Sequence, residues 1–163
     1  MLAKQVYHTA CRISYRTAIY HLTLPFHRFY AMIHLRLVIL MTKEEFYNKW
    51  IEVFASNIPK NDIQKYVKST GNYIWHIFSW GLLNENQYLI GEKAKEAYDK
   101  IDKKGAFYIE WFEDKHTKDM ICDLNTAKAL DDFVEIYIVG KDFKWTYIKT
   151  HEGMCGPYFM INK

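Results

Sequence analysis

The segment of residues 150–157 concentrates the side chains of this sequence that could carry out chemistry. An imidazole, a carboxylate and a thiol fall within five positions, on His151, Glu152 and Cys155. A further imidazole, His76, lies in an aromatic run earlier in the chain. Nitrogen, oxygen and sulfur ligands of these types together suit zinc. The sequence contains no Cys-x-x-Cys or His-x-x-x-His pair, so the spacing specifies no metal, and we predict no cofactor.

The same side chains could instead form a thiol-dependent or metal-dependent hydrolase. Cys155 would be the thiolate nucleophile and His76 or His151 the base, with Glu152 orienting the imidazole. Ser79 is not flanked by both glycines of the Gly-x-Ser-x-Gly motif that α/β-hydrolases use. A purely structural role is the third interpretation: the loop's polar side chains bind its own backbone, and the thiol packs as a small apolar group. The residue types leave all three interpretations open.

The elements that must position these residues follow from the hydrophobic pattern. Four segments have the spacing or composition of helices, namely residues 42–55, 61–69, 92–101 and 125–132. Four segments rich in branched and aromatic side chains are predicted strands, namely residues 106–112, 133–139, 143–149 and 158–161. Residues 73–80 fit a buried strand and a buried helix equally well. Helices early and hairpin-connected strands late indicate an α+β domain, with an antiparallel sheet and helices packed on one face.

Aromatic side chains make up 17% of the sequence, and many of them flank the reactive residues. Exposed Trp and Tyr side chains carry much of the binding energy of protein interfaces, whereas those at alternate strand positions fill the space between sheet and helices. Core packing is the stronger interpretation for most of them, and a groove for a partner or ligand, formed by some of them, is the alternative. The candidate binding residues are Trp75, His76, Ser79, Trp145, Thr150, His151, Glu152, Cys155 and Tyr158.

Charge divides the chain near Met41. Residues 1–40 contain five basic residues and no Asp or Glu, so the remainder carries all 19 acidic residues and is slightly acidic. Thr42 follows Met41 and could cap a helix, which is typical of a protein's start. We therefore interpret residues 1–40 as an upstream extension outside a single domain of residues 41–163. An organellar targeting peptide, or a segment that lies on a membrane surface or a partner, is the alternative.

Two clusters carry a family resemblance. Residues 75–79 read WHIFS, and residues 142–159 read DFKWTYIKTHEGMCGPYF. Together with residues 89–94, LIGEKA, they resemble the bacterial family of domains of unknown function numbered 4275. The resemblance covers about residues 41–163. It implies a small bacterial, cytoplasmic protein and transfers no catalytic role to any residue.

The preferred functional prediction is a non-enzymatic module that binds a protein partner or a small ligand. An immunity or antitoxin-like role suits the length and the slightly acidic domain. The acidic balance disfavours nucleic acid, whose phosphates reward clustered Lys and Arg, and we expect no membrane contact by residues 41–163. Three cysteines without framework spacing agree with a reducing, cytoplasmic location. The alternative is the hydrolase, which requires His76 and His151 to converge in space.

Overall fold

The computed structural model describes residues 40–162 of the 163-residue chain. The predicted upstream extension lies, apart from its last residue, outside this part of the chain. Met41 and Thr117 exchange two hydrogen bonds: the Met41 amide donates to the Thr117 side-chain oxygen at 3.0 Å, and the Thr117 amide donates to the Met41 carbonyl at 2.8 Å. The beginning of the described chain is thereby joined to the loop that precedes the shortest strand.

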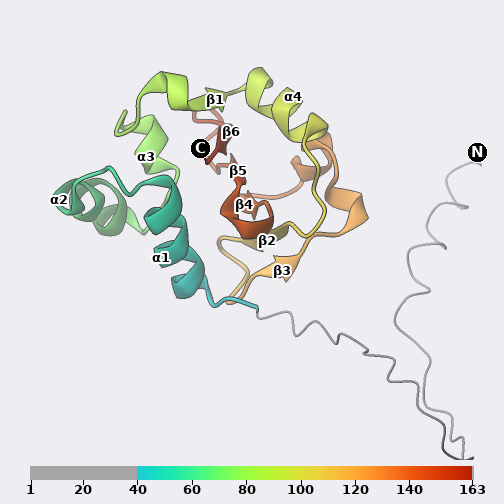
Figure 1. Cartoon of the computed structure of the whole chain (residues 1–163), viewed down its shortest axis with the longest axis horizontal. Coiled ribbons are helices and arrows are strands. Elements are labelled where there is room, and N and C mark those ends of the chain that lie inside the picture. The colour runs from blue at the N-terminus through green and yellow to red at the C-terminus, as the bar shows by residue number, and fades with distance from the viewer. Residues whose placement is uncertain (1–39, 163) are drawn as a thin grey trace, which may run out of the picture. The chain divides into compact units, whose positions relative to one another are not determined.

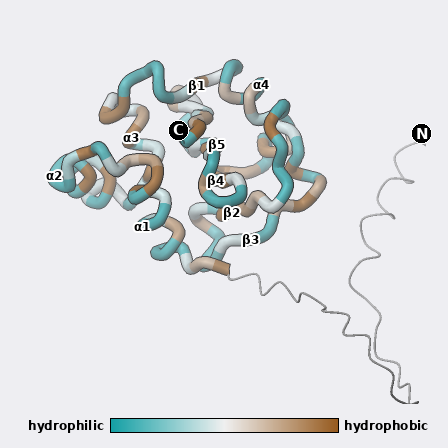
Figure 2. The backbone as a smooth tube through the Cα atoms, viewed as in Figure 1, coloured by the Kyte–Doolittle hydropathy of each residue, from teal (hydrophilic) through white to brown (hydrophobic). Residues whose placement is uncertain are grey.

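Helix α1, Lys43–Phe54, begins with the predicted cap. The Thr42 hydroxyl accepts a hydrogen bond from the Glu45 amide at 3.2 Å, and the Glu45 carboxylate accepts one from the Thr42 amide at 2.8 Å. This capping box gives partners to amides that a helix start otherwise leaves free. Apolar and polar residues alternate along α1 (Figure 2), and Trp50 on its buried side donates to the Thr146 hydroxyl of the sheet at 3.0 Å.

Helical structure continues through three short segments after α1. They are α2, Lys60–Asp62, a π-helical stretch, Ile63–Val67, and a 3-10 turn, Lys68–Thr70. The segment ends at Gly71, whose φ of +98° is a left-handed conformation that favours glycine. The predicted helix of residues 61–69 and its stop are therefore confirmed.

The aromatic run of residues 73–80 contains a short helix rather than a strand. Helix α3, His76–Ser79, buries Ile77 and Phe78. Helix α4, Glu92–Lys100, confirms the helix predicted over residues 92–101, and its inward side chains Ala94 and Tyr98 are fully buried.

Six strands form one antiparallel sheet in the order β1-β6-β5-β4-β2-β3. Their bounds are β1 Tyr88–Ile90, β2 Phe107–Glu110, β3 Lys118–Asp119, β4 Ile136–Val139, β5 Trp145–Lys149 and β6 Tyr158–Ile161. The four predicted strands are present, although three are shorter at their ends. Strands β1 and β3 were not predicted, because runs of two or three residues carry no readable alternation. Two further 3-10 turns, Cys122–Leu124 and Ala127–Leu130, precede β4.

The α+β fold class is confirmed, but helices cover both faces of the sheet rather than one. Alternate residues of β4 show this: Tyr137 and Val139 pack in the core that contains α1 and α3, whereas Ile136 and Ile138 pack in the core that contains α4. Figure 1 shows α1 and α3 on one side of the sheet and α4 on the other. All four residues of β4 are buried, which is the pattern of a strand covered on both faces. No helix within residues 40–162 is both long and apolar enough to cross a membrane.

Candidate functional site

A buried carboxylate, absent from our sequence-based candidates, organises one end of the sheet. Glu135 directly precedes β4 and is 2% exposed. Its Oε2 accepts a hydrogen bond from Trp75 Nε1 at 3.1 Å and lies 2.5 Å from Nδ1 of His151. Its Oε1 accepts a hydrogen bond from the Tyr137 hydroxyl at 2.5 Å. A buried carboxylate is costly without such partners, so these three donors are what make its position tolerable.

Strand register explains why these groups meet. Ile136 of β4 pairs with Lys149 of β5, so the residue before β4 and the residues after β5 lie at the same end of the sheet. Glu135 and Tyr137 are two apart and therefore point to the same face. Burial and the Glu135 carboxylate raise the pKa of Tyr137 well above its ordinary value, while hydrogen bonds from the Trp75 and Ile74 backbone act in the opposite direction. The Tyr137 phenol thus remains a donor.

The sequence did carry a signal for Glu135. It is the single charged residue inside the apolar run of residues 133–139, which reads FVEIYIV. A strand that is buried on both faces has no solvated position for a carboxylate, so an acidic residue there requires specific donors. The apolar run thus predicts both the strand and a set of buried donors for its one acidic residue.

Aromatic rings surround His151. The ring centres of Tyr73, Trp75 and Phe112 lie 5.0, 5.5 and 5.6 Å from the imidazole centre. Phe112 is 52% exposed and the side chain of His151 is 28% exposed. We call Tyr73, Trp75, Phe112 and His151 the aromatic patch. The patch combines the exposed ring of Phe112 with an imidazole that is hydrogen-bonded to the buried carboxylate of Glu135.

Glu135 also determines which nitrogen of His151 is available. A carboxylate oxygen only accepts hydrogen bonds, so Nδ1 of His151 carries the hydrogen in this pair. In the neutral ring Nε2 is then the acceptor. The pair therefore fixes both the orientation and the tautomer of an imidazole at the surface.

His76 lies in the same region but is bound differently. Its Nδ1 is 2.7 Å from the Thr70 hydroxyl and 3.1 Å from the Tyr66 carbonyl, which fastens α3 to the end of the preceding helical segment. Its ring centre lies 4.1 Å from that of Trp75, which also contacts His151. The two histidines thus flank the same tryptophan.

Cys155 and Glu152 form a separate contact within the loop after β5. The thiol lies 3.6 Å from Oε2 of Glu152. Burial, followed by the hydrogen bond and charge of Glu152, raises the pKa of Cys155, which is the opposite of what a thiolate nucleophile needs. The Thr150 hydroxyl donates to the carbonyls of both Glu152 and Cys155 and so closes the loop. These contacts agree with the structural interpretation of the loop.

The residues that we considered as zinc ligands, His76, His151, Glu152 and Cys155, do not form a metal site in the described part of the chain. Within residues 40–162, no three His, Cys, Asp or Glu side chains form a group that could hold a metal ion. The reason is that each candidate has another partner: His151 binds Glu135, His76 binds Thr70, and Glu152 binds Cys155.

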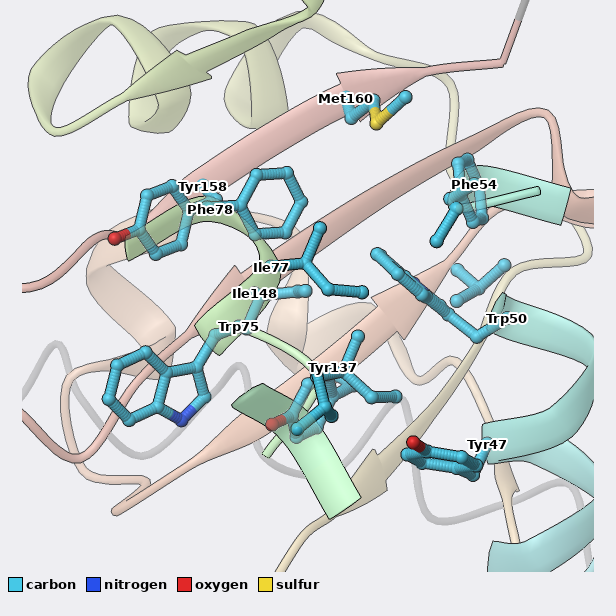
Figure 3. Packing of buried hydrophobic residues seen from close by; sticks show 14 of the residues in the cluster. Tyr47, Trp50, Phe54, Trp75, Ile77, Phe78, Tyr137, Ile148, Tyr158 and Met160 are labelled. Carbon is cyan, nitrogen blue, oxygen red and sulfur yellow. The ribbon is translucent and has the colours of Figure 1, made fainter. Parts of the chain in front are cut away.

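Three further candidates, Trp145, Tyr158 and Ser79, are not members of the aromatic patch. Trp145 is at the opposite end of β5 from His151 and packs on the α4 side of the sheet. Tyr158 is 2% exposed and stacks on Phe78 with ring centres 4.6 Å apart (Figure 3). Burial, followed by the nearby Cys155, raises the pKa of Tyr158 to about 12. Ser79 is exposed at the end of α3.

Comparison with known proteins bears on the family of the chain. A family model described as "Domain of unknown function (DUF4275)" matches residues 38–159. No curated protein and no solved structure matches the chain. The matched segment includes every residue of the aromatic patch and Glu135. The chain therefore belongs to the DUF4275 family, as the two sequence clusters indicated.

Proposed function

We propose that this protein is a non-enzymatic binding module of the bacterial cytoplasm, which recognises a partner protein through the aromatic patch. The observation that carries the proposal is the exposed ring of Phe112 beside His151, whose imidazole the buried Glu135 holds in place. Exposed aromatic side chains with fixed neighbours are the usual energetic centres of protein interfaces. An immunity or antitoxin-like role is one setting for such a module. In this proposal nucleic acid is not a partner, and residues 41–163 do not contact a membrane.

The charges beside the patch favour a basic partner. Glu113 follows Phe112 and Glu152 follows His151, and both are exposed. A lysine or arginine that approached Phe112 would gain a cation–π contact and the attraction of two carboxylates. We therefore propose a partner that presents Lys or Arg among apolar side chains.

Rigidity of the patch supports the same conclusion. Trp75 is 1% exposed, donates to Glu135 and contacts His151, so two of the four patch rings are already fixed before a partner arrives. Association costs less when side chains need not be ordered on binding. The hydrogen bonds of Glu135 would thus increase affinity without touching the partner.

The test is selection of peptide ligands on the full chain. Random 12-residue peptides displayed on phage are enriched on the wild-type protein and then measured against Phe112→Ala and Ile161→Ala. Ile161 is also 52% exposed but ends β6, at the opposite end of the sheet, and serves as the control. We expect enriched peptides to combine Lys or Arg with an apolar residue and to lose about tenfold or more in affinity only for Phe112→Ala. Acidic peptides, or peptides indifferent to Phe112, would contradict the proposal.

One observation favours hydrolysis as a second candidate function. An imidazole oriented by a buried carboxylate is also the arrangement of a general base. In that role His151 would activate water, because the raised pKa of Cys155 makes its thiol a poor nucleophile. Hydrolysis of p-nitrophenyl acetate measures this directly. A rate that falls at least a hundredfold in His151→Ala would support the enzyme, whereas equal rates for the two proteins would exclude this role of His151.

A further inference from the structure

A second site is indicated by a cavity of about 440 Å³ beside the first turns of α1. Residues from three parts of the chain line it: α1, the end of the helical segment after α2, and the residue after β2. The lining residues, all polar or aromatic, are Lys43, Glu44, Tyr47, Asn48, Lys68, Asn72 and Trp111. The volume is within the range of small-molecule sites, about 300 to 1,000 Å³.

An unpartnered hydroxyl singles out this cavity. Within residues 40–162, the Tyr47 hydroxyl is the one buried side-chain oxygen or nitrogen without a hydrogen-bond partner. Tyr47 is 7% exposed and lines the cavity, and Figure 3 shows its oxygen pointing away from the axis of α1. Burial raises the pKa of Tyr47, so the phenol keeps its proton and remains a donor. A buried donor without an acceptor is costly. The Tyr47 oxygen has almost no accessible surface in the free protein, so a ligand that displaces the groups covering it would supply the acceptor.

The charges of the lining favour an anion. Lys43 and Lys68 contribute two ammonium groups, against the single carboxylate of Glu44. The Lys43 ammonium donates to the Trp111 carbonyl and lies 4.1 Å from the centre of the Trp111 ring. Because an ammonium group has three donors, this bond leaves donors for a ligand. Burial lowers the pKa of Lys43, whereas the carboxylates of Glu135 and Asp114 raise it, and a bound anion would favour the charged form further.

We propose that this cavity binds a small aromatic or apolar molecule with an oxyanion group, a carboxylate or a phosphate. The oxyanion accepts hydrogen bonds from the Tyr47 hydroxyl and from the lysine ammonium groups, and the amides of Asn48 and Asn72 are further donors. The apolar part of the ligand lies against the indole of Trp111. Every polar side chain of the lining other than Glu44 can donate a hydrogen bond to an oxyanion. A cationic ligand could not accept these hydrogen bonds.

This site lies beside the aromatic patch without sharing a residue with it. Asn72 and Trp111 line the cavity, whereas Tyr73 and Phe112, the next residue in each case, belong to the patch. Binding at the cavity is therefore a property independent of partner recognition. A variant of one site should leave the other intact, which allows the two proposals to fail separately.

The experiment uses calorimetric titration of the full chain with four probes of similar size. Benzoate and phenyl phosphate are anionic, benzyl alcohol is neutral, and phenyltrimethylammonium is cationic. We expect binding of the anionic probes only, and the stronger of the two identifies carboxylate or phosphate as the natural group. Tyr47→Phe should weaken that binding about tenfold, the effect of losing a hydrogen bond to a charged group. It should also raise the melting temperature of the free protein, because it removes the unpaired hydroxyl.

Two variants control for charge and location. Lys68→Ala should weaken anion binding at least fivefold, whereas Lys93→Ala, an exposed lysine of α4 on the other side of the sheet, should leave it unchanged. Phe112→Ala should also leave it unchanged. Three results would overturn the proposal. The first is equal binding of the neutral or cationic probe, and the second is no detectable binding of either anion at 10 mM, about the upper limit of a useful small-ligand affinity. The third is equal affinity of the anions for the wild type and Tyr47→Phe. In the last case the hydroxyl has a water partner only.

Discussion

The imidazole of His151 and the carboxylate of Glu135 meet across a sequence separation of 16 residues, with 2.5 Å between Nδ1 and Oε2. One group is fully buried and the other reaches the surface. The buried carboxylate therefore fixes the orientation of a side chain that a partner can contact. Trp75 completes the arrangement, because it donates to the same carboxylate oxygen and packs against the same imidazole.

Removal of the buried carboxylate should destabilise the fold more than removal of its surface partner. Glu135→Ala leaves the Trp75 indole and the Tyr137 hydroxyl without an acceptor, and should lower the free energy of unfolding by about 3 kcal/mol. His151→Ala should cost about 1 kcal/mol, because the imidazole is partly exposed and two donors to Glu135 remain. Urea unfolding of both variants gives the two values. Equal losses would show that Glu135 serves only the histidine.

A close approach between backbone and indole predicts an intolerant glycine. A Cβ at Gly140 would lie 2.2 Å from Nε1 of Trp145, a side chain that is only 5% exposed. Gly140→Ala should therefore lower the free energy of unfolding by about 2 kcal/mol or more. Gly153 is the matched control, because a Cβ there would meet no atom within 4 Å. Gly153→Ala should change stability by less than about 0.5 kcal/mol. Similar thermal unfolding curves for the two variants would contradict the predicted contact.

Alkaline pH should destabilise the protein through its buried tyrosines. Burial raises the pKa of Tyr98, Tyr137 and Tyr147 above the ordinary value of 10.0, and that of Tyr158 to about 12. The folded state thus binds protons that the unfolded state has lost, so their contribution is complete below pH 10 and declines as pH rises toward the folded values. Desolvation lowers the pKa of Lys43, which acts in the opposite direction.

Urea unfolding at pH 8, 10 and 11 measures the net effect. The midpoint should fall between pH 10 and 11, since more tyrosines than lysines have shifted values. Absorbance of phenolate at 295 nm should rise together with loss of circular dichroism. If all tyrosines titrated while the protein stayed folded, burial would not be what raises their pKa, and the prediction would be wrong.

The thiol of Cys155 should react slowly. Its raised pKa reduces the thiolate fraction at pH 7.5 below that of an ordinary cysteine, and only the thiolate attacks iodoacetamide. Mass spectrometry of tryptic peptides over time should give a rate below that of free cysteine under the same conditions. Glu152→Gln removes a neighbouring negative charge and should raise the rate. A rate above that of free cysteine would restore the case for a nucleophile.

Much of the fold could be predicted because its elements are long enough to show a period. Helices α1 and α4 were found in this way, whereas the four-residue strand β6 was found from its apolar composition after a Gly-containing loop. Helix α3 was ambiguous, since the largely aromatic run of residues 73–80 around it has no period that separates a helix from a strand. The second helical layer was missed for a different reason: the continuous apolar run at β4 indicates cover on both faces, and we had assigned helices to one face only.

The site was only partly predictable. Residue type alone indicated Trp75, His76 and His151, and the structure places both imidazoles against the indole of Trp75. Trp145 does not join them, because it begins β5, six positions before His151, and a strand rises about 3.3 Å per residue. Glu135 was missed because a search by reactive residue type favours clusters. It is the single charged residue of its apolar run, and the pairing of β4 with β5 brings it close to its partner His151.

The central claim is that the exposed ring of Phe112 and its anchored neighbours recognise a basic partner. The most direct test is calorimetric titration of the consensus peptide from phage selection into wild-type protein, Phe112→Ala and Ile161→Ala, with a second peptide in which Glu replaces each Lys or Arg. We predict that Phe112→Ala and the charge-reversed peptide each weaken binding about tenfold or more, while Ile161→Ala binds as the wild type does. Equal affinity of wild type and Phe112→Ala, or tighter binding of the acidic peptide, would contradict the account.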